Sequence, residues 1–202
     1  MKVDDSYRET HALADGTRVT LRLLQPSDAE DLRRGFRALS PRSRYRRFLS
    51  EAAELTDEQV RYLTETDGVN HVAIVATTES LDLKSELGLG VARFVRLRDA
   101  PEVAEAAVTV VDEAQGRGIG RLLLALLARA ARERGVRTLR AEVLAANPPV
   151  REILREVGAV VRSDDGVTLT ADVPLAPEAG HDESPARRLL RAVAASLASL
   201  GR

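Results

Sequence analysis

The stretch VTVVDEAQGRGIGRLLL, residues 108–124, decides the fold of this chain. A run of β-branched residues is followed by two acids, a turn with three alternating glycines, and a leucine-rich segment. The first run is typical of a strand and the last of a helix. Glycines keep side chains away from the backbone amides of a turn, and the beginning of a helix attracts anions. The stretch therefore predicts a strand, an anion-binding turn and a helix in succession.

Two nucleotide-binding motifs do not fit this glycine turn. A Walker phosphate loop requires Lys followed by Ser or Thr, and neither pair occurs here. A dinucleotide fingerprint requires a further glycine where this chain has Arg121 or Leu123. A tight turn without a ligand needs one glycine rather than three. The favoured interpretation is a cradle in which the amides of residues 117–121 bind a diphosphate, with Arg117 and Arg121 as counter-charges.

Hydrophobic periodicity extends the prediction to both sides of this stretch. Capping-box spacings at Ser27 and Glu30, and at Thr56 and Gln59, mark the beginnings of two helices. The glycines within residues 87–95 indicate a bulge or a close backbone approach. Consecutive strands before a strand–turn–helix–strand unit predict an α/β (α+β) fold, with a mixed sheet and helices on both faces. The expected strands are 18–24, 71–78, 87–95, 102–111, 137–143, 159–162 and 167–173, and the expected helices are 27–39, one from residue 40, 57–64, 118–134 and 147–157.

Composition narrows the class of function. The chain has no Cys, and its three His residues lie far apart, so we predict no metal site. The formal net charge is −1, which gives no field to attract nucleic acid or an anionic membrane. No apolar run approaches the roughly 20 residues that span a bilayer, and no signal peptide is recognisable. We therefore expect a cytoplasmic protein without nucleic-acid or membrane partners.

The two ends of the chain differ in character from its middle. Residues 1–15 are polar and predict an N-terminal tail, and residues 16–173 hold the periodic segments of the domain. Three prolines and several acids in residues 174–185 indicate a linker. Residues 186–202 carry a leucine stripe beside arginines, which predicts an amphipathic helix that docks on the domain or on a partner in a homodimer.

The order Q-x-x-G-x-G, from Gln115 to Gly120, resembles the acyl-CoA pyrophosphate loop of the GNAT superfamily of N-acetyltransferases. The segments ALSPRSRYRRF, TDGVNHVAIVA and AEVLAANPPVREILREVGA extend this likeness over most of residues 16–173. Together they resemble the acetyltransferase domain of bacterial Pat-type protein lysine acetyltransferases. The resemblance implies the GNAT fold, in which the central sheet is mostly antiparallel and two central strands splay apart around acetyl-CoA.

The resemblance also implies roles for individual residues. Backbone groups of the strand would pair with the pantetheine arm of acetyl-CoA, and the N–H of Val110 would polarise the thioester oxygen. Asn147 would bond the pantetheine, although Asn is also well suited to a helix N-cap. The implied cofactor-binding residues are Val108, Thr109, Val110, Gln115, Gly116, Arg117, Gly118, Ile119, Gly120, Arg121 and Asn147.

Glu105 is the implied general base, because it lies ten residues before Gln115, where the Pat-type enzymes carry their catalytic glutamate. Its small apolar neighbours in the sequence predict partial burial, which suits a carboxylate to proton transfer, directly or through water. A solvated glutamate without a catalytic role remains an alternative, and Glu102 and Glu113 are the other candidates for the base.

The chain departs from the family that it resembles at the group that protonates the leaving thiolate. Many relatives have a tyrosine in the last helix, where this chain has Leu154. The usual Gly-Phe pair is Gly158-Ala159. Water can protonate a thiolate, so catalysis does not require the tyrosine; Tyr45 and Tyr62 are other candidates.

Three functions are compatible with the sequence. The first is transfer of an acetyl group from acetyl-CoA to a protein lysine, which rests on the family resemblance alone. The second is acetylation of a small-molecule amine, amino acid or antibiotic, and the third is a non-catalytic module that senses acyl-CoA. The arginines of residues 42–48 are interpreted as a helix face that shapes the substrate groove, because stacking aromatics for nucleic acid are lacking.

Overall fold

The computed structural model describes residues 2–48, 54–79, 86–163 and 166–175. These residues form an eight-stranded sheet in the order β1-β2-β3-β4-β5-β6-β8-β7. Neighbouring strands are antiparallel except β5 and β6, which are parallel. The strands are β1 (Arg8–Ala12), β2 (Arg18–Leu23), β3 (His71–Glu79), β4 (Glu86–Arg96), β5 (Val103–Val110), β6 (Thr138–Leu144), β7 (Val160–Ser163) and β8 (Thr168–Pro174).

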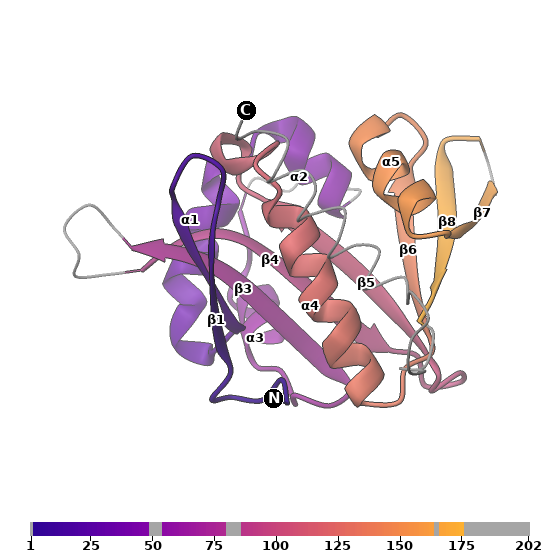
Figure 1. Cartoon of the computed structure of the whole chain (residues 1–202), viewed down its shortest axis with the longest axis horizontal. Helices are drawn as coiled ribbons and strands as arrows, with labels where there is room; N and C mark the ends of the chain where they lie inside the picture. The colour runs from indigo at the N-terminus through magenta and orange to yellow at the C-terminus, as the bar shows by residue number, and fades with distance from the viewer. Residues whose placement is uncertain (1, 49–53, 80–85, 164–165, 176–202) are drawn as a thin grey trace.

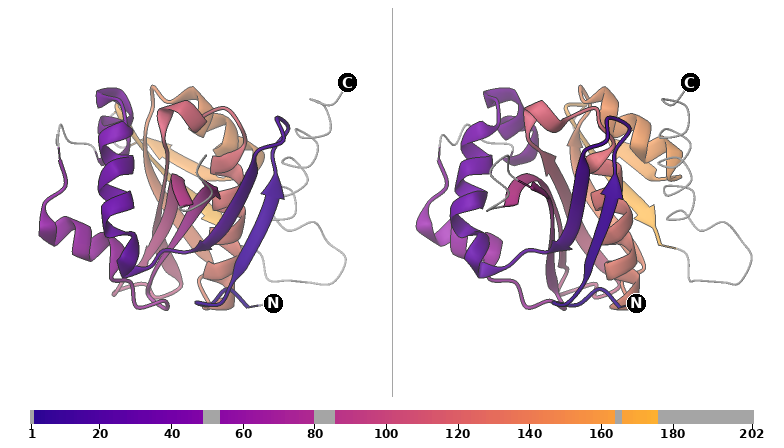
Figure 2. Two further views of the ribbon diagram at one scale, coloured as in Figure 1. Left: turned by 90° about the vertical axis from the view of Figure 1, so that its left-hand side faces the viewer. Right: turned by 60° about the vertical axis from the view of Figure 1, so that its left-hand side comes forward.

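Helices cover both faces of the sheet (Figure 1). The first three lie on one face and α4 lies on the other, together with α5, as the turned views show (Figure 2). This arrangement confirms the predicted mixed, mostly antiparallel sheet with helices on both faces. The helices are α1 (Ala29–Ala38), α2 (Pro41–Phe48), α3 (Asp57–Thr64), α4 (Ile119–Glu133) and α5 (Pro148–Glu156), and the short 3-10 helices are η1 (Pro26–Asp28) and η2 (Asp112–Ala114).

The main core lies between α4 and the sheet. The apolar face of α4 is fully buried at Ile119, Leu123 and Leu127, and the helix contacts β3, β4 and β5. Gly90 permits this close packing, since a Cβ atom there would lie 3.2 Å from Leu123 Cδ1 on α4 and 2.7 Å from the carbonyl oxygen of Thr109 on β5. The register of β3 against β4 shifts at Ala76, opposite Gly90, which confirms the bulge that the glycines indicate.

Capping residues explain which helix boundaries follow from the sequence. Helix α3 has the predicted bounds, because Thr56 and Gln59 form the reciprocal capping box. The spacing of Ser27 and Glu30 does not mark the beginning of α1. There the carboxylate of Asp28, the N-cap residue, accepts a hydrogen bond from the Gln25 amide at 2.7 Å, and η1 precedes the helix.

The segment predicted to be an N-terminal tail contains β1, which pairs with β2 along its length. Val3 and Tyr7 are buried in the main core, and the Val3 amide donates to Glu133 Oε2 at 2.8 Å. The sequence did not reveal this strand because β1 is mostly exposed and polar. Its sequence, RETHA, therefore lacks the alternation that marks a half-buried strand.

The predicted linker and amphipathic helix, residues 174–185 and 186–202, lie outside the described residues from position 176 onward. Pro174 ends β8, and Leu175 is buried in the main core, where its amide donates to the Arg137 carbonyl at 2.7 Å. Within the part of the chain that the structure describes, no helix is long and apolar enough to cross a membrane.

Candidate active site

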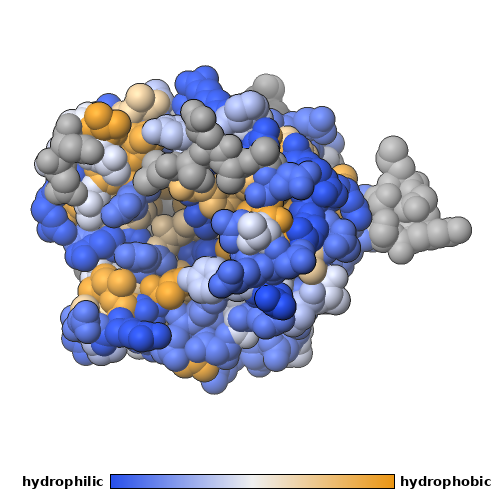
Figure 3. All heavy atoms as spheres, turned by 180° about the vertical axis from the view of Figure 1, so that it is seen from behind, coloured by the Kyte–Doolittle hydropathy of each residue, from blue (hydrophilic) through white to orange (hydrophobic). Residues whose placement is uncertain are grey.

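Strands β5 and β6 diverge in the middle of the sheet. They pair only from Val103 to Glu105 with Thr138 to Arg140, and beyond these residues the strands separate. A cleft of about 430 Å³ lies between them, bounded by the second half of β5, the beginning of α4, and α5. Seen from behind, the molecule is hollowed on the side of its C-terminal strands, with apolar residues around the hollow (Figure 3). The divergence gives the sheet the shape that the splayed-strand prediction requires.

The edge of β5 presents peptide groups to this cleft, and one of them, the Val110 carbonyl, accepts a hydrogen bond from Gln115 at 3.0 Å. The Val111 amide donates to the Leu89 carbonyl at 2.9 Å, so the odd-numbered residues of β5 bond toward β4. Antiparallel pairing alternates, and therefore the N–H and C=O groups of Val108 and Val110 point away from β4, toward the cleft. An amide-bearing ligand could pair with these groups as an added strand does.

The glycine turn connects the cleft edge of β5 to α4. Gly116 and Gly118 have φ angles of +75° and +86°, which residues with a Cβ rarely adopt. Gly118 is the N-cap of α4, and the first turn of the helix contains no acidic residue. The amides of Ile119 and Gly120 have no intrahelical acceptor at this position in a helix. The turn therefore offers N–H groups and the positive end of the helix dipole to an anion.

The two arginines of the turn differ in orientation. Arg121 lines the cleft, bonds Glu156 at 3.0 Å and keeps a buried Nε atom without a hydrogen-bond partner. Arg117 is absent from the lining of the cleft and forms an ion pair with Asp15 at 2.5 Å. Arg117 thus fixes the turn to the β1–β2 connection in this structure, and Arg121 is the better placed counter-charge.

Asn147 is the N-cap residue of α5, but its side chain makes no capping hydrogen bond. It lines the cleft across from β5, so its amide group can bond a ligand there. Leu154 is buried on the same helix, packed in a cluster with Val143 and Ala171. The position of the tyrosine found in many relatives is therefore occupied by a core side chain.

Glu105 lies where β5 and β6 begin to separate. Its side chain is exposed, so the predicted partial burial is wrong. It stands opposite Val95 on β4, and its parallel neighbour Arg140 is bonded to Asp172 at 2.8 Å. The other candidate bases, Glu102 and Glu113, are also exposed. An exposed carboxylate can move a proton through water, but its environment does not single it out.

The structure brings together in the cleft all of the predicted cofactor residues except Arg117. Glu105 and Arg117 do not line it. Tyr45 and Tyr62 do not line it either, and both are exposed on the surface. The predicted residues that line the cleft are Val108, Thr109, Val110, Gln115, Gly116, Gly118, Ile119, Gly120, Arg121 and Asn147.

Helix α2 supplies two of the arginines expected to shape the substrate groove and one residue, Ser43, that sequence reasoning missed. Ser43, Arg46 and Arg47 line the cleft from this helix. Asp112 accepts hydrogen bonds from Ser40 Oγ at 2.8 Å and from Ser43 Oγ at 2.9 Å, and thereby attaches α2 to the glycine turn. No local pattern could predict this contact, because about 70 residues separate its partners in the sequence.

Gln115 completes the attachment between α2, the turn and β5. Its Nε2 donates to the Val110 carbonyl at 3.0 Å and to Ser43 Oγ at 3.3 Å. The glutamine that begins the Q-x-x-G-x-G motif thus lies at the cleft, where it holds the end of β5.

Comparison with known proteins identifies the family. Residues 18–160 match the model of the acetyltransferase (GNAT) domain. The chain belongs to this family. It is 39% identical over 156 residues to acetyltransferase Pat from Mycolicibacterium smegmatis, covering 76% of this chain and 45% of that protein. The chain therefore spans less than half the length of this GNAT relative.

Two further relatives are matched over most of their length. An acetyltransferase of Pseudomonas aeruginosa is 31% identical over 154 residues, which is 76% of this chain and 81% of that protein. The crystal structure of the GNAT domain of PAT from S. lividans superposes with a TM-score of 0.75 at 30% identity. That match covers 83% of this chain and 97% of the other, and it confirms the GNAT fold.

Proposed function

We propose that this GNAT protein is an acetyl-CoA-dependent N-acetyltransferase and that its acceptor is a protein lysine. The observation that carries the proposal is the cleft between β5 and β6, which joins the cleft-facing edge of β5 to the amides of the glycine turn. This combination suits a ligand with amide groups at one end and a diphosphate at the other. A structural neighbour from Salmonella typhimurium, 18% identical, is described with acetyl-CoA as its cofactor.

In this proposal the chain holds the thioester and removes a proton. Val108 and Val110 would bond the pantetheine amides, while Gly118, Ile119 and Gly120 would bind the pyrophosphate. The N–H of Val110 would stabilise negative charge on the carbonyl oxygen as the amine attacks. Asn147 would orient the arm from the opposite wall. The thiolate leaves and takes a proton from water, because Leu154 has none to give.

Proton removal falls to Glu105 in the same proposal. A lysine amine is mostly protonated at neutral pH, since its ordinary pKa is about 10.4, so a base must act before or during attack. The exposed position of Glu105 fits a relay through water better than direct contact. The choice of a lysine acceptor rests on the likeness to the Pat-type enzymes, and a small-molecule amine is the second candidate.

The decisive experiment incubates the protein with labelled acetyl-CoA and a cell lysate, then separates macromolecules from small molecules. Label on protein lysines is the expected result, and label confined to small amines would select the second candidate. Binding of unlabelled acetyl-CoA is measured in parallel by calorimetry. Tight binding without transfer to any fraction would identify a non-catalytic acyl-CoA sensor instead.

A further inference from the structure

A second cavity lies on the other side of β5, beneath α1 and α2. Its volume is about 80 Å³, and it shares Arg47 and Thr109 with the lining of the large cleft. The two cavities therefore adjoin through β5 and α2. Most of the wall of the small cavity is apolar, formed by Phe36, Leu39, Phe48, Leu63, Val75 and Val91.

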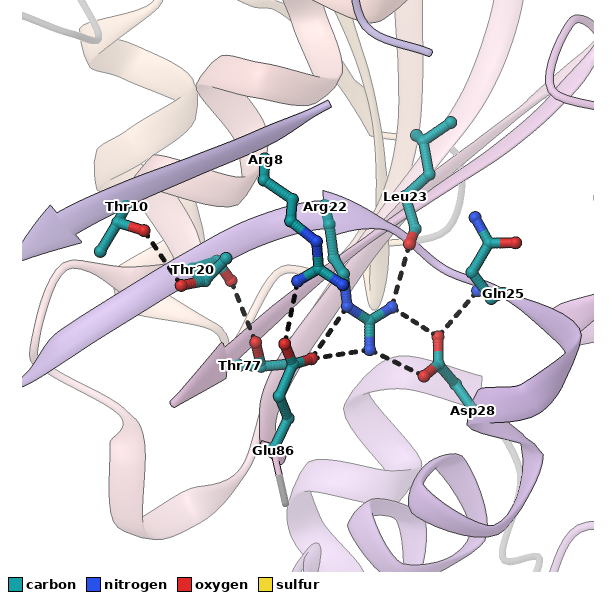
Figure 4. Close-up of polar contacts among 9 residues, drawn as sticks. All are labelled: Arg8, Thr10, Thr20, Arg22, Leu23, Gln25, Asp28, Thr77 and Glu86. Atoms are coloured by element: carbon teal, nitrogen blue, oxygen red, sulfur yellow. Dashed lines mark hydrogen bonds and ion pairs between the residues drawn. The ribbon is translucent and has the colours of Figure 1, made fainter. Parts of the chain in front are cut away.

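Three arginines also line this cavity, and one of them is neutralised by carboxylates. Arg22 bonds both oxygens of Asp28, at 2.7 and 2.8 Å, and bonds Glu86 at 2.9 Å (Figure 4). The other acid in the wall, Asp31, is paired with Arg34 at 2.8 Å. Both carboxylates in the cavity wall are thus already paired, Asp28 with Arg22 and Asp31 with Arg34.

The remaining arginines, Arg47 and Arg93, have no carboxylate partner within the described part of the chain. Arg93 is 6% exposed, and its guanidinium lies 3.1 Å from the Leu63 carbonyl and 3.1 Å from His71 Nε2, neither of which carries negative charge. Arg47 is half-buried with its guanidinium over the ring of Phe48, 4.8 Å from the centroid. Glu105 lies two residue pairs along the β4–β5 ladder from Arg93, and no ion pair joins these two described residues.

Such an arrangement is costly for a folded protein. Burial of an unpaired charge opposes folding, and two like charges near one another add repulsion. Burial and then the charge of Arg47 lower the pKa of Arg93 to about 10, which leaves its guanidinium protonated at neutral pH. Perturbed ionisable groups gather at functional sites, where a ligand can complete the pairing of a buried charge.

We propose that Arg47 and Arg93 form a subsite for a carboxylate of the acceptor, close to the amine that is acetylated. Guanidinium groups match the planar geometry of a carboxylate, and the apolar wall suits the aliphatic chain that links it to the amine. The position of Arg47 between the two cavities places the bound carboxylate near the cofactor cleft. This inference rests on the proposed acetyltransferase function, because it names the kind of amine that the same site accepts.

The carboxylate has two possible sources, and paired acceptors distinguish them. Nα-acetyl-lysine against its amide tests an α-carboxylate, as in free amino acids and C-terminal lysines. Acetyl-Glu-Lys-amide against acetyl-Gln-Lys-amide tests a neighbouring acidic side chain. Each pair is assayed for acetyl transfer and for binding by calorimetry, with the full chain, with Arg47→Gln and with Arg93→Lys. Arg42→Gln is the control, since Arg42 is an exposed arginine of the same helix that lines neither cavity.

We expect the charged member of at least one pair to be used about 10- to 100-fold better in kcat/KM, the range that charged hydrogen bonds give. Arg47→Gln should remove most of this preference without changing the KM for acetyl-CoA, and Arg42→Gln should retain it. Arg93→Lys keeps the charge and tests whether the fork geometry is needed if larger changes at this buried site prevent folding.

The outcomes separate this inference from the function on which it rests. Equal use of both members of each pair, with acetyl transfer intact, would overturn the subsite alone. A raised KM for acetyl-CoA in Arg47→Gln, with the preference unchanged, would assign Arg47 to the cofactor and also overturn it. Charge-dependent binding without any transfer would leave the subsite standing and remove the acetyltransferase proposal.

Discussion

At the scale of single residues, Glu105 shows the difference between a motif and an environment. The resemblance assigns it the role of base, whereas the structure places it exposed and outside the lining of the cleft. Its position on β5 is nevertheless specific, since Glu105 stands at the last residue pair before the strands diverge. An amine that enters the divergence from this face would pass close to it.

Glu105→Gln should therefore lower turnover by about 100-fold or more, because general base catalysis contributes that much. The affinity for acetyl-CoA should not change, since Glu105 does not line the cleft. Glu79→Gln is the matched variant, an exposed glutamate of β3 that lines neither cavity. Steady-state kinetics and calorimetry make the comparison, and equal turnover of the two variants across pH would remove Glu105 as the base.

Gly118 gives a second test at this scale. Gly118→Ala should cost about 1–2 kcal/mol of stability, because a residue with a Cβ is strained at a φ of +86°. A shifted turn should also weaken acetyl-CoA binding. Gly135→Ala is the control for binding, since Gly135 has a similar φ of +78° but lies beyond the other end of α4, outside the lining of the cleft. Unfolding curves and titrations with acetyl-CoA measure both effects, and unchanged affinity in Gly118→Ala would argue against the cradle.

At the scale of elements, the loop before β3 depends on one carboxylate. The carboxylate of Asp67 accepts hydrogen bonds from the amides of Val69, Asn70 and His71 at 2.7 to 2.9 Å. Burial alone would raise the pKa of Asp67, but these hydrogen bonds outweigh it and lower the pKa to about 2. The loop thus leads into the strand that positions His71 beside Arg93.

The lowered pKa fixes the sign of a pH effect. A carboxyl whose pKa is lower in the folded state stabilises it above the ordinary value of 3.8, and this contribution is lost as the pH falls toward 2. Asp67→Asn should reduce stability at pH 7 and flatten the dependence of stability on pH between about 4 and 2. Urea unfolding at several pH values checks this, and parallel curves for both proteins would contradict it.

Elements also show how far the sequence predicts this fold. The bounds of α3 follow from its capping box, and the bulge opposite Gly90 follows from glycines in a strand. Strand β1 could not be predicted, because an exposed polar edge strand carries no alternation. The Q-x-x-G-x-G motif implied that the glycine turn lines the cleft. The pairing of Asp112 with Ser40 and Ser43 depends on tertiary contacts alone.

At the scale of the whole molecule, both ends of the described chain belong to the core. Deletion of residues 2–7 should lower the stability by about 3 kcal/mol or more, because Val3 and Tyr7 are almost fully buried. The substitution Ser6→Ala, at an exposed position in the same segment, should have little effect. Thermal unfolding compares the two proteins, and an unchanged midpoint after the deletion would support a dispensable tail.

The C-terminal boundary can be placed between two neighbouring residues. Deletion of residues 176–202 should preserve acetyl-CoA binding, whereas a deletion that also removes Leu175 should lower stability by about 2 kcal/mol. Leu175 is 5% exposed and packs in the main core. Calorimetry and thermal unfolding of the two truncations give the comparison. Loss of acetyl-CoA binding in the shorter deletion would assign the last segment to the site.

The attachment of α2 to the glycine turn has a consequence for substrate binding. Through Ser43, Gln115 and Asp112, the helix that walls the small cavity is bonded to the loop at the large cleft. Arg47 on the same helix faces both spaces. Acetyl-CoA in the large cleft and an acceptor in the small cavity should therefore each change the affinity of the other, and the two changes should be equal in size.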